Sequence, residues 1–332
     1  MANKVIFGTI VSILIGLTGC SNNPMAPTQV EGWTPTVVER VDGGFVDFAL
    51  VEDNGTYHII GIDGLQGDWI REDYESFGFV HMTSTDMKNW TEQENIKDPL
   101  YNHEFSANHI WAPSIIKVDS LWYMFYTGVK RGTEPNQSDN EQRIMRSTSS
   151  DLYNWSDPIF VLDGTSPLTC WGGGQAWDND CRDPDVFLLN EDLGLYGMVL
   201  SLKQADRASM IIGWAMSTDL ENWTITSVVE QTGSAYWEYF HDGRPNWRFA
   251  ESPQYLKHEG TAYLFWTPND GTCPIVEFGG PTYTKQGGKA CEILPKGDGT
   301  YWYAYLTNSS PAGFDIKIET MYFENGQPWF QE

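Results

Sequence analysis

Three acidic residues, Asp47, Asp183 and Glu251, occupy comparable places in repeated segments of this 332-residue chain. Each lies 10 to 13 residues before a tyrosine in an aromatic, strand-like segment. The same place in a further repeat is held by Ala112 of Trp111-Ala112-Pro113. Carboxyl groups whose environments separate their pKa values can act as proton donor and proton acceptor. These three residues are therefore the chain's candidates for acid–base chemistry.

A motif that recurs about every 67 residues indicates how distant segments are arranged. The pattern S-x-D-x-x-N-W occurs at residues 84–90, 149–155 and 217–223, with spacings of 65 and 68 residues. Each copy follows a strand-like segment, so we interpret it as a turn whose Asp and Asn side chains bond to backbone N–H groups while the Trp packs on the sheet. Asp86, Asp151 and Asp219 are accordingly expected to be structural rather than catalytic.

Aromatic strand-like segments form a second series with a similar period. They lie around Tyr57, Tyr123, Tyr196, Tyr263 and Tyr303, which indicates five units. Repeated units of this length that cannot bury their faces alone are typical of a β-propeller. The prediction is an all-β, five-bladed propeller in one domain, residues 36–332. A pair of β-sandwiches or a parallel β-helix is the alternative; the long period disfavours the helix, and no obvious linker divides the chain.

Propeller geometry would bring the three acids together, because comparable positions on the innermost strands surround the central axis. Neighbouring carboxylates destabilise one another and raise at least one pKa, a cost that suggests chemistry. Glycosidic bond cleavage needs one protonated carboxyl to protonate the leaving oxygen and one carboxylate to activate water or attack the sugar. The alternatives are ordinary strand-end carboxylates and ligands of a cation in the channel.

Three short motifs carry a resemblance to a known class of enzymes. Cys-Arg-Asp-Pro-Asp-Val-Phe at 181–187 resembles the R-D-P motif of the five-bladed propeller glycoside hydrolases of families 43 and 32, and Ala-Glu-Ser-Pro at 250–253 resembles their E-x-P motif. Ile-Trp-Ala-Pro-Ser at 110–114 is similar to the W-A-P strand of family 43. The resemblance covers about residues 40–310 and implies a glycoside hydrolase.

The resemblance also implies roles for individual residues. Asp47 would be the general base, Asp183 the acid that orients and tunes the others, Glu251 the general acid, and Arg182 a ligand of sugar hydroxyls. Phe48 follows Asp47 where the families usually have Pro, and no N-D-P-N-G signature of fructan-cleaving enzymes occurs. Family 43 is therefore preferred, and with it an inverting reaction in which a water lies between the base and the sugar.

Other residues are secondary candidates for substrate binding. Trp111 and Trp171 could stack on sugar faces, although most Trp residues in a propeller pack between sheets. His109 could face the channel and hold a water or cation, and a satisfied structural histidine is the competing interpretation.

The leading functional hypothesis is hydrolysis of plant or algal poly- or oligosaccharides. The alternatives are a non-catalytic carbohydrate-binding lipoprotein, a retaining family 32-like fructosidase and a propeller used for protein interaction. A phosphorolytic enzyme would need a cationic pocket, for which Arg182, Arg244 and Arg248 are the candidates.

The N-terminus reads as an export signal. Lys4 precedes the apolar run 5–17, which is too short to span a bilayer, and Leu-Thr-Gly-Cys at 17–20 resembles a bacterial lipobox. We expect residues 1–19 to be a signal peptide, Cys20 to be lipidated and residues 20–35 to form a tether, which anchors the protein to the bacterial outer membrane.

Composition limits the remaining partners. The 20 Lys and Arg residues against 45 Asp and Glu give a net charge of −25, which excludes nucleic acid as an expected partner. Cys170, Cys181, Cys273 and Cys291 suggest disulfides in an exported chain, with 170–181 and 273–291 the simplest of three pairings. No metal site is predicted from these Cys, because no CxxC or His spacing fits zinc. No cofactor is required, a structural calcium ion in the central channel stays an open alternative, and a monomer is expected.

Overall fold

The computed structural model describes residues 34–40, 43–64, 78–97, 99–106, 109–130, 141–172, 179–205, 210–229, 250–268, 272–310 and 313–331. These residues form strands and turns, with no α-helix among them. Accordingly, nothing in this part of the chain is a helix suited to crossing a membrane. The predicted signal peptide, Cys20, Arg244 and Arg248 lie outside the described residues.

Twenty of the strands form hairpin-connected sheets in sequence order, and β1 joins the last of them. Three sheets have four strands each: β6 (His109–Val118), β7 (Leu121–Lys130), β8 (Glu141–Ser149) and β9 (Ile159–Leu162); β10 (Cys181–Asn190), β11 (Leu195–Lys203), β12 (Met210–Ser217) and β13 (Thr224–Val229); β14 (Glu251–His258), β15 (Thr261–Thr267), β16 (Thr272–Glu277) and β17 (Thr282–Gln286). The fourth sheet has nine strands: β2 (Phe45–Asp53), β3 (Thr56–Asp63), β4 (Phe79–Ser84), β5 (Thr91–Glu92), β18 (Lys289–Pro295), β19 (Tyr301–Ser310), β20 (Gly313–Glu324), β1 (Thr36–Val38) and β21 (Gln327–Gln331).

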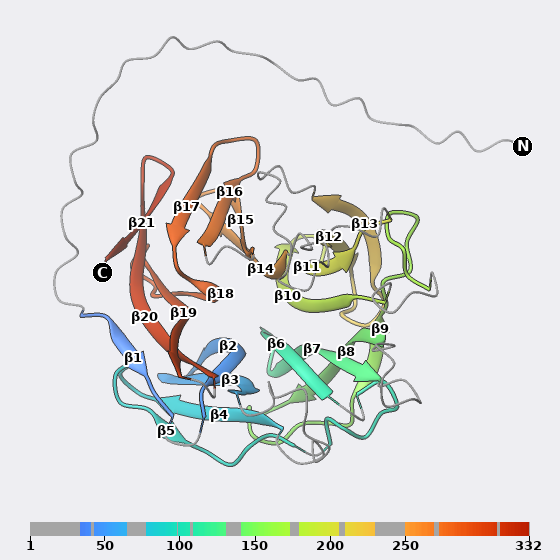
Figure 1. Cartoon of the computed structure of the whole chain (residues 1–332), viewed down its shortest axis with the longest axis horizontal. Coiled ribbons are helices and arrows are strands. Elements are labelled where there is room, and N and C mark those ends of the chain that lie inside the picture. Colours follow the sequence, from blue (N-terminus) through green and yellow to red (C-terminus); the bar gives the residue numbers. More distant parts are fainter. Residues whose placement is uncertain are drawn as a thin grey trace, which may run out of the picture. The chain divides into compact units, whose positions relative to one another are not determined.

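The first strand of each successive hairpin unit lies near the centre of the molecule. Figure 1 shows β2, β6, β10, β14 and β18 around a common axis, with the later strands of each unit farther out. Each of these inner strands contacts the next, and β18 contacts β2, so the inner strands close into a ring. Radial sheets around a closed ring confirm the predicted all-β propeller.

The nine-stranded sheet joins the two ends of the ring. The strand β1 pairs with β20, with Thr36 opposite Ile318. Between β2 and β20 the ladder consists of the single pair Phe45 and Phe314. Pairing an N-terminal strand with the last unit ties the first and last sheets together, which leaves a propeller with only short, protected edges.

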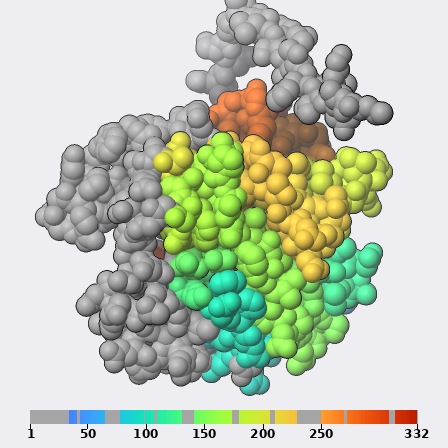
Figure 2. Space-filling view, turned by 90° about the vertical axis from the view of Figure 1, so that its right-hand side faces the viewer, coloured from blue at the N-terminus to red at the C-terminus, as the bar shows by residue number. Residues whose placement is uncertain are grey.

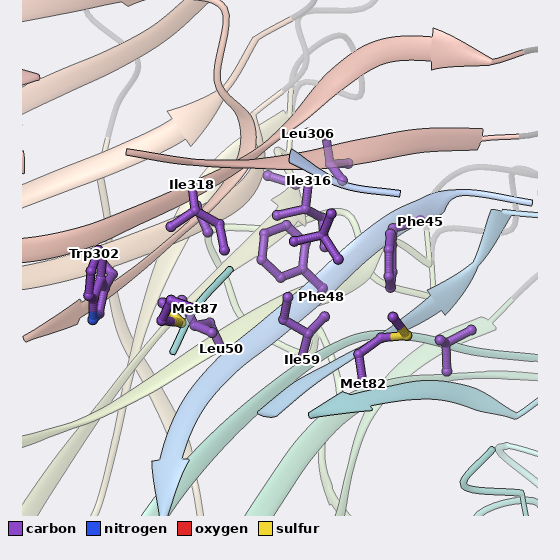
Figure 3. Close-up of a cluster of buried hydrophobic side chains, with 14 residues drawn as sticks. Phe45, Phe48, Leu50, Ile59, Met82, Met87, Trp302, Leu306, Ile316 and Ile318 are labelled. Atoms are coloured by element: carbon purple, nitrogen blue, oxygen red, sulfur yellow. The ribbon is translucent and has the colours of Figure 1, made fainter. Parts of the chain in front are cut away.

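Apolar side chains fill the spaces between neighbouring sheets. Figure 3 shows one such cluster, in which side chains of the first unit such as Phe48 and Leu50 face Ile316, Ile318 and Trp302 of the last unit. Four further clusters lie between the remaining pairs of adjacent sheets. Because each sheet buries both faces against its neighbours, the inner ring is held in place by its packing.

The recurring turn has the structure that the sequence predicted. In the second copy, the Oδ1 atom of Asp151 accepts the backbone N–H groups of Tyr153 (2.9 Å) and Asn154 (2.7 Å), and the buried Trp155 packs between the sheets. Leu152, buried at this turn, has a φ of 67°. The copies at Asp86 and Asp219 bond in the same way. Figure 2 shows the side of the molecule where the last copy, in amber, lies among surface segments.

The cysteines differ from the expectation of disulfides. Cys170, Cys181, Cys273 and Cys291 are all buried and none forms a disulfide in the structure. The Sγ atoms of Cys273 on β16 and Cys291 on β18 lie 3.9 Å apart. That separation is nearly twice the S–S bond length of about 2.05 Å, so the pair is in contact as thiols.

Candidate active site

Each inner strand contains an irregularity at the same place, close to its start. The ladder to the next strand shifts register between Phe45 and Phe48, Trp111 and Ser114, Arg182 and Asp185, Glu251 and Gln254, and Lys289 and Glu292. In four of the strands the residue just after the last regular pair has a positive φ, namely Ala112, Asp183, Ser252 and Ala290. Bulges of this kind re-aim side chains near a functional site.

The bulges correct the sequence alignment of the three acids. Glu251 occupies the position before the bulge, as Arg182 does on β10. Asp183 is the first residue within the bulge and Asp47 the second, so Asp47 matches Pro184 rather than Asp183. Counting back from the tyrosines did not preserve register because the hairpins that intervene differ in length.

The acids nevertheless meet, through two bridging residues. The Ser252 hydroxyl donates to Asp47 Oδ1 at 2.9 Å, and the Ser252 backbone N–H donates to Asp183 Oδ2 at 3.1 Å. Arg182 pairs with Glu251 (Nη2 to Oε1, 2.7 Å) and lies 3.6 Å from Asp183 Oδ2 through its Nε atom. Side chains from β2, β10 and β14 therefore form one cluster at the ring.

Burial and mutual repulsion govern the two aspartates of this cluster. Desolvation, followed by the charge of Asp183, raises the pKa of Asp47, while the Ser252 hydrogen bond and Arg182 oppose the rise. Desolvation also raises the pKa of Asp183 to about 6, which Arg182 partly offsets. The side chain of Asp183 is 6% exposed, whereas that of Glu251 is 36% exposed. Glu251 is thus the acid of this pair that solvent reaches.

Arg182 is the cation of the site, and its donors are engaged by protein groups. Besides Glu251 and Asp183, its guanidinium contacts Asp180 Oδ1 at 3.2 Å and Gln142 Oε1 at 3.1 Å. Its side chain is 11% exposed. The observed contacts make Arg182 the counter-charge of the carboxylates; its contact with sugar hydroxyls stays a prediction.

A second layer of polar residues lies two positions farther along the inner strands, and sequence reasoning missed it. Ser114, Asp185, Gln254 and Glu292 resume the regular ladder after their bulges. Asp185 accepts the Tyr255 backbone N–H at 2.7 Å, and burial raises its pKa to about 7. Burial, followed by the charge of Asp185, raises the pKa of Glu292 well above its usual range. The available signal was Asp185 itself, two residues after Asp183 in the same motif.

The aromatic candidates fall in different places. Trp111 precedes the bulge of β6, in register with Arg182 and Glu251, and stacks on His109 with 6.0 Å between ring centres. Trp171 instead packs on the apolar cluster between the β6–β9 and β10–β13 sheets. A Cβ atom on Gly164 would come within 2.5 Å of its indole. The environment of Trp171 is one of packing.

No grouping of three or more His, Cys, Asp and Glu side chains suited to holding a metal ion occurs among the described residues. The channel residues Asp185, Gln254 and Glu292 thus do not form a ready ligand set for the calcium ion considered from the sequence. The chemistry of the site is argued from its carboxyl groups and Arg182.

Comparisons with known proteins agree with this arrangement. The family model of glycosyl hydrolases family 43 matches residues 70–279. Among curated proteins, a 1,2-β-oligomannan phosphorylase of Thermoanaerobacter sp. (strain X514) is 29% identical over 126 residues, which are 35% of this chain and 37% of the phosphorylase. The matched part is therefore well under half of either protein.

Solved structures share the fold at low sequence identity. A thermostable family-43 glycoside hydrolase is 16% identical, with 92% of this chain and 96% of that chain covered and a TM-score of 0.59. An exo-1,5-α-L-arabinanase from a bovine ruminal metagenomic library is 17% identical, with 87% and 97% covered and a TM-score of 0.56. Sucrose-6-phosphate hydrolase from Lactobacillus gasseri is 12% identical, with 89% and 62% covered and a TM-score of 0.65.

Proposed function

The chain belongs to the glycosyl hydrolases of family 43, and on that premise we propose that it hydrolyses glycosidic bonds of plant or algal poly- or oligosaccharides with inversion. The observation that carries this proposal is the meeting of Asp47, Asp183 and Glu251 through Ser252 and Arg182. A glycosidase needs two carboxyl groups in different environments. Asp47 and Glu251 meet that need, since they bond to different partners and only one of them lies against Arg182.

In the proposed reaction each acid has one task. Glu251, which solvent reaches, donates its proton to the leaving oxygen of the scissile bond. Asp47, whose Oδ1 atom is held by Ser252, removes a proton from the water that attacks the anomeric carbon. Asp183 lies between them and influences both through its charge. For Glu251 to hold a proton, the bound sugar must weaken its ion pair with Arg182, because that pair favours the carboxylate.

The test of hydrolysis combines a substrate screen with a single substitution. Wild-type protein is assayed on chromogenic arabinofuranosides, xylosides and galactosides, and the best substrate is then used with Glu251→Gln. We expect the rate to fall about 10²–10⁴-fold with sugar binding by calorimetry retained. Glu191→Gln, on an exposed turn, is the matched control. Binding of sugars without turnover by the wild type would instead identify a carbohydrate-binding protein.

Inversion has its own measurement. Proton NMR of the first product released shows the anomeric configuration before mutarotation. Inversion is expected because resemblance to family 43, rather than family 32, places a water between Asp47 and the sugar. A retained configuration would overturn the inverting mechanism and would favour the fructosidase-like alternative, in which the carboxylate is the nucleophile.

Phosphorolysis is a second candidate because of the similarity to an oligomannan phosphorylase. Phosphate would need a cation with donors to spare, whereas those of Arg182 face Glu251, Asp180 and Gln142. The discriminating assay supplies β-1,2-linked mannan oligosaccharides with and without inorganic phosphate. A phosphate-dependent release of sugar 1-phosphate would replace hydrolysis as the function.

Export and anchoring are part of the same proposal. The proposed leader 1–19 and lipobox place the lipid on Cys20 and the propeller beyond the bacterial outer membrane or on its periplasmic face. Full-length protein and Cys20→Ala are compared by labelling with a fatty-acid analogue and by membrane fractionation. Label on the wild type alone supports the anchor, while equal label on both contradicts it.

An exported location would expose the thiols to oxidation. We propose that Cys273 and Cys291 form a disulfide there, because their buried Sγ atoms lie 3.9 Å apart on β16 and β18. A disulfide-bearing oxidant takes two electrons, two protons leave the thiols, and one S–S bond forms. Peptide mass spectrometry of protein isolated from the periplasm, without reductant, identifies the linked peptides, and separate thiols in that sample would refute the bridge. The 170–181 pairing is read from the same digest.

Two further expectations are tested by direct measurement. A bound calcium ion is detected by elemental analysis of the purified protein, and a calcium content below one per chain after desalting removes this expectation. No step of the proposed reaction uses the ion. The expected monomer is checked by light scattering after size-exclusion chromatography.

A further inference from the structure

We propose that Ser252 is a positioning residue, which holds the general base and the orienting acid in one geometry and keeps the base in its working form. The inference rests on the proposed function for the roles of Asp47 and Asp183. Its physical content, a hydroxyl that controls Asp47, can be measured without any substrate.

Ser252 touches more of the acid cluster than any of its register mates. Its hydroxyl donates to Asp47 Oδ1 at 2.9 Å, across 205 residues of sequence. Its backbone N–H donates to Asp183 Oδ2 at 3.1 Å. It also directly follows Glu251 in the chain. One residue therefore connects the three strands that supply the acids.

The fold does not itself require this hydroxyl. Ser252 occupies the first position of its bulge with a φ of 46°, and the residues at the same position on β6 and β18 are Ala112 (φ 42°) and Ala290 (φ 46°). Alanine thus satisfies the same backbone conformation in two other inner strands. The Ser252 side chain differs from theirs by the oxygen that contacts Asp47, so a function of that contact is the natural explanation.

The hydroxyl acts on the ionised form of Asp47. A donor stabilises a carboxylate, whereas Asp183 on β10, Glu251 on β14 and Glu292 on β18 face Asp47 with like charge. Arg182 on β10 is the cation that faces it. Donation to Oδ1 also fixes the rotation of the carboxyl group, which leaves Oδ2 to accept a proton from water.

The experiment compares Ser252→Ala and Ser252→Gly with the wild type. Both variants lack the hydroxyl, and Gly in addition relieves the positive φ, so a shared effect belongs to the hydroxyl rather than to the backbone. Ser147→Ala is the control, since Ser147 is buried and its hydroxyl donates to the Ser156 carbonyl at 2.6 Å, away from the acids. Thermal unfolding confirms that each variant is folded.

Two readouts are measured. Without Ser252's hydroxyl, the acidic limb of kcat/KM should move to higher pH by about one unit, with a roughly tenfold loss of rate on that limb and convergence towards wild type at alkaline pH. Carbon-13 NMR of the Asp47 carboxyl should show its titration displaced in the same direction. An equal loss of rate at every pH, or an unmoved Asp47 titration, would overturn the inference.

The two proposals fail in different ways. If wild-type protein cleaves no glycoside, the proposed function falls, but the NMR titration of Asp47 still decides whether Ser252 controls it. If hydrolysis is established and neither readout shifts, only the role of Ser252 is lost.

Discussion

Arg182 and Glu251 precede the bulge on neighbouring inner strands and form an ion pair with 2.7 Å between Nη2 and Oε1. The candidate proton donor is therefore held by the main cation of the site when no sugar is bound. Arg182 also compensates Asp180, which is 6% exposed. Its loss would leave several carboxylates without a counter-charge.

Substitution of Arg182 by Gln is expected to destabilise the protein strongly. Removing one partner from a buried ion network costs about 3–5 kcal/mol, because the remaining charges stay desolvated. Denaturation by urea at neutral pH measures the free energy of unfolding. Lys130→Gln, which removes a largely exposed pair with Glu104, should cost no more than about 1 kcal/mol. Similar losses for both variants would show that Arg182 is not a structural counter-charge.

The activity is expected to require alkaline conditions for ionisation of the base. The pKa of Asp47 is raised to about 8 by desolvation and by the charge of Asp183. A base works only when ionised, so kcat/KM should increase as the pH rises through about 8. Asp47→Asn should lower the rate about 10²–10⁴-fold. A rate that is constant between pH 5 and 9 would contradict this role of Asp47.

The channel carboxyls should weaken the fold as the pH rises. The pKa of Asp185, raised to about 7, and the raised pKa of Glu292 mean that the folded state holds protons that the unfolded state releases. Their stabilising contribution is present below the unfolded pKa values and is lost as the pH rises through the folded ones. Glu292→Gln cannot ionise, so its Tm should exceed that of wild type at pH 9 by several degrees and match it near pH 4. The exposed Glu324→Gln is the control, and identical pH profiles for Glu292→Gln and wild type would refute the prediction.

The recurring turns should contribute to stability through their aspartates. Asp151→Ala removes the acceptor of the Tyr153 and Asn154 backbone N–H groups, which should cost about 1 kcal/mol, as loss of a capping acceptor does. These bonds lower the pKa of Asp151 to about 2, so the contribution should disappear only when the pH falls through about 2. Urea denaturation at pH 7 checks the magnitude. Asp192→Ala, on an exposed turn, should stay within about 0.5 kcal/mol of wild type, and an equal loss there would contradict the turn's role.

Local chemistry in the sequence determined much of this protein. The S-x-D-x-x-N-W turns could be identified because Asp bonds to backbone groups two and three residues away, within the motif itself. Their repetition, with the aromatic strands, predicted the propeller, and the R-D-P and E-x-P motifs identified Asp183, Arg182 and Glu251 as a group. All of these inferences depend on patterns that are complete within a few residues or that recur along the chain.

Only the tertiary structure decided which atoms meet. The bulges placed Asp47, Asp183 and Glu251 at three different register positions, and ring closure then set Ser252 against Asp47, 205 residues away. The same geometry buried Asp185 and Glu292 beneath the site and left Cys273 and Cys291 in contact as thiols. A bulge changes the direction of a side chain without changing residue type or hydrophobic period, and contacts across the ring depend on all the sheets packing together, so the linear pattern carries no record of either.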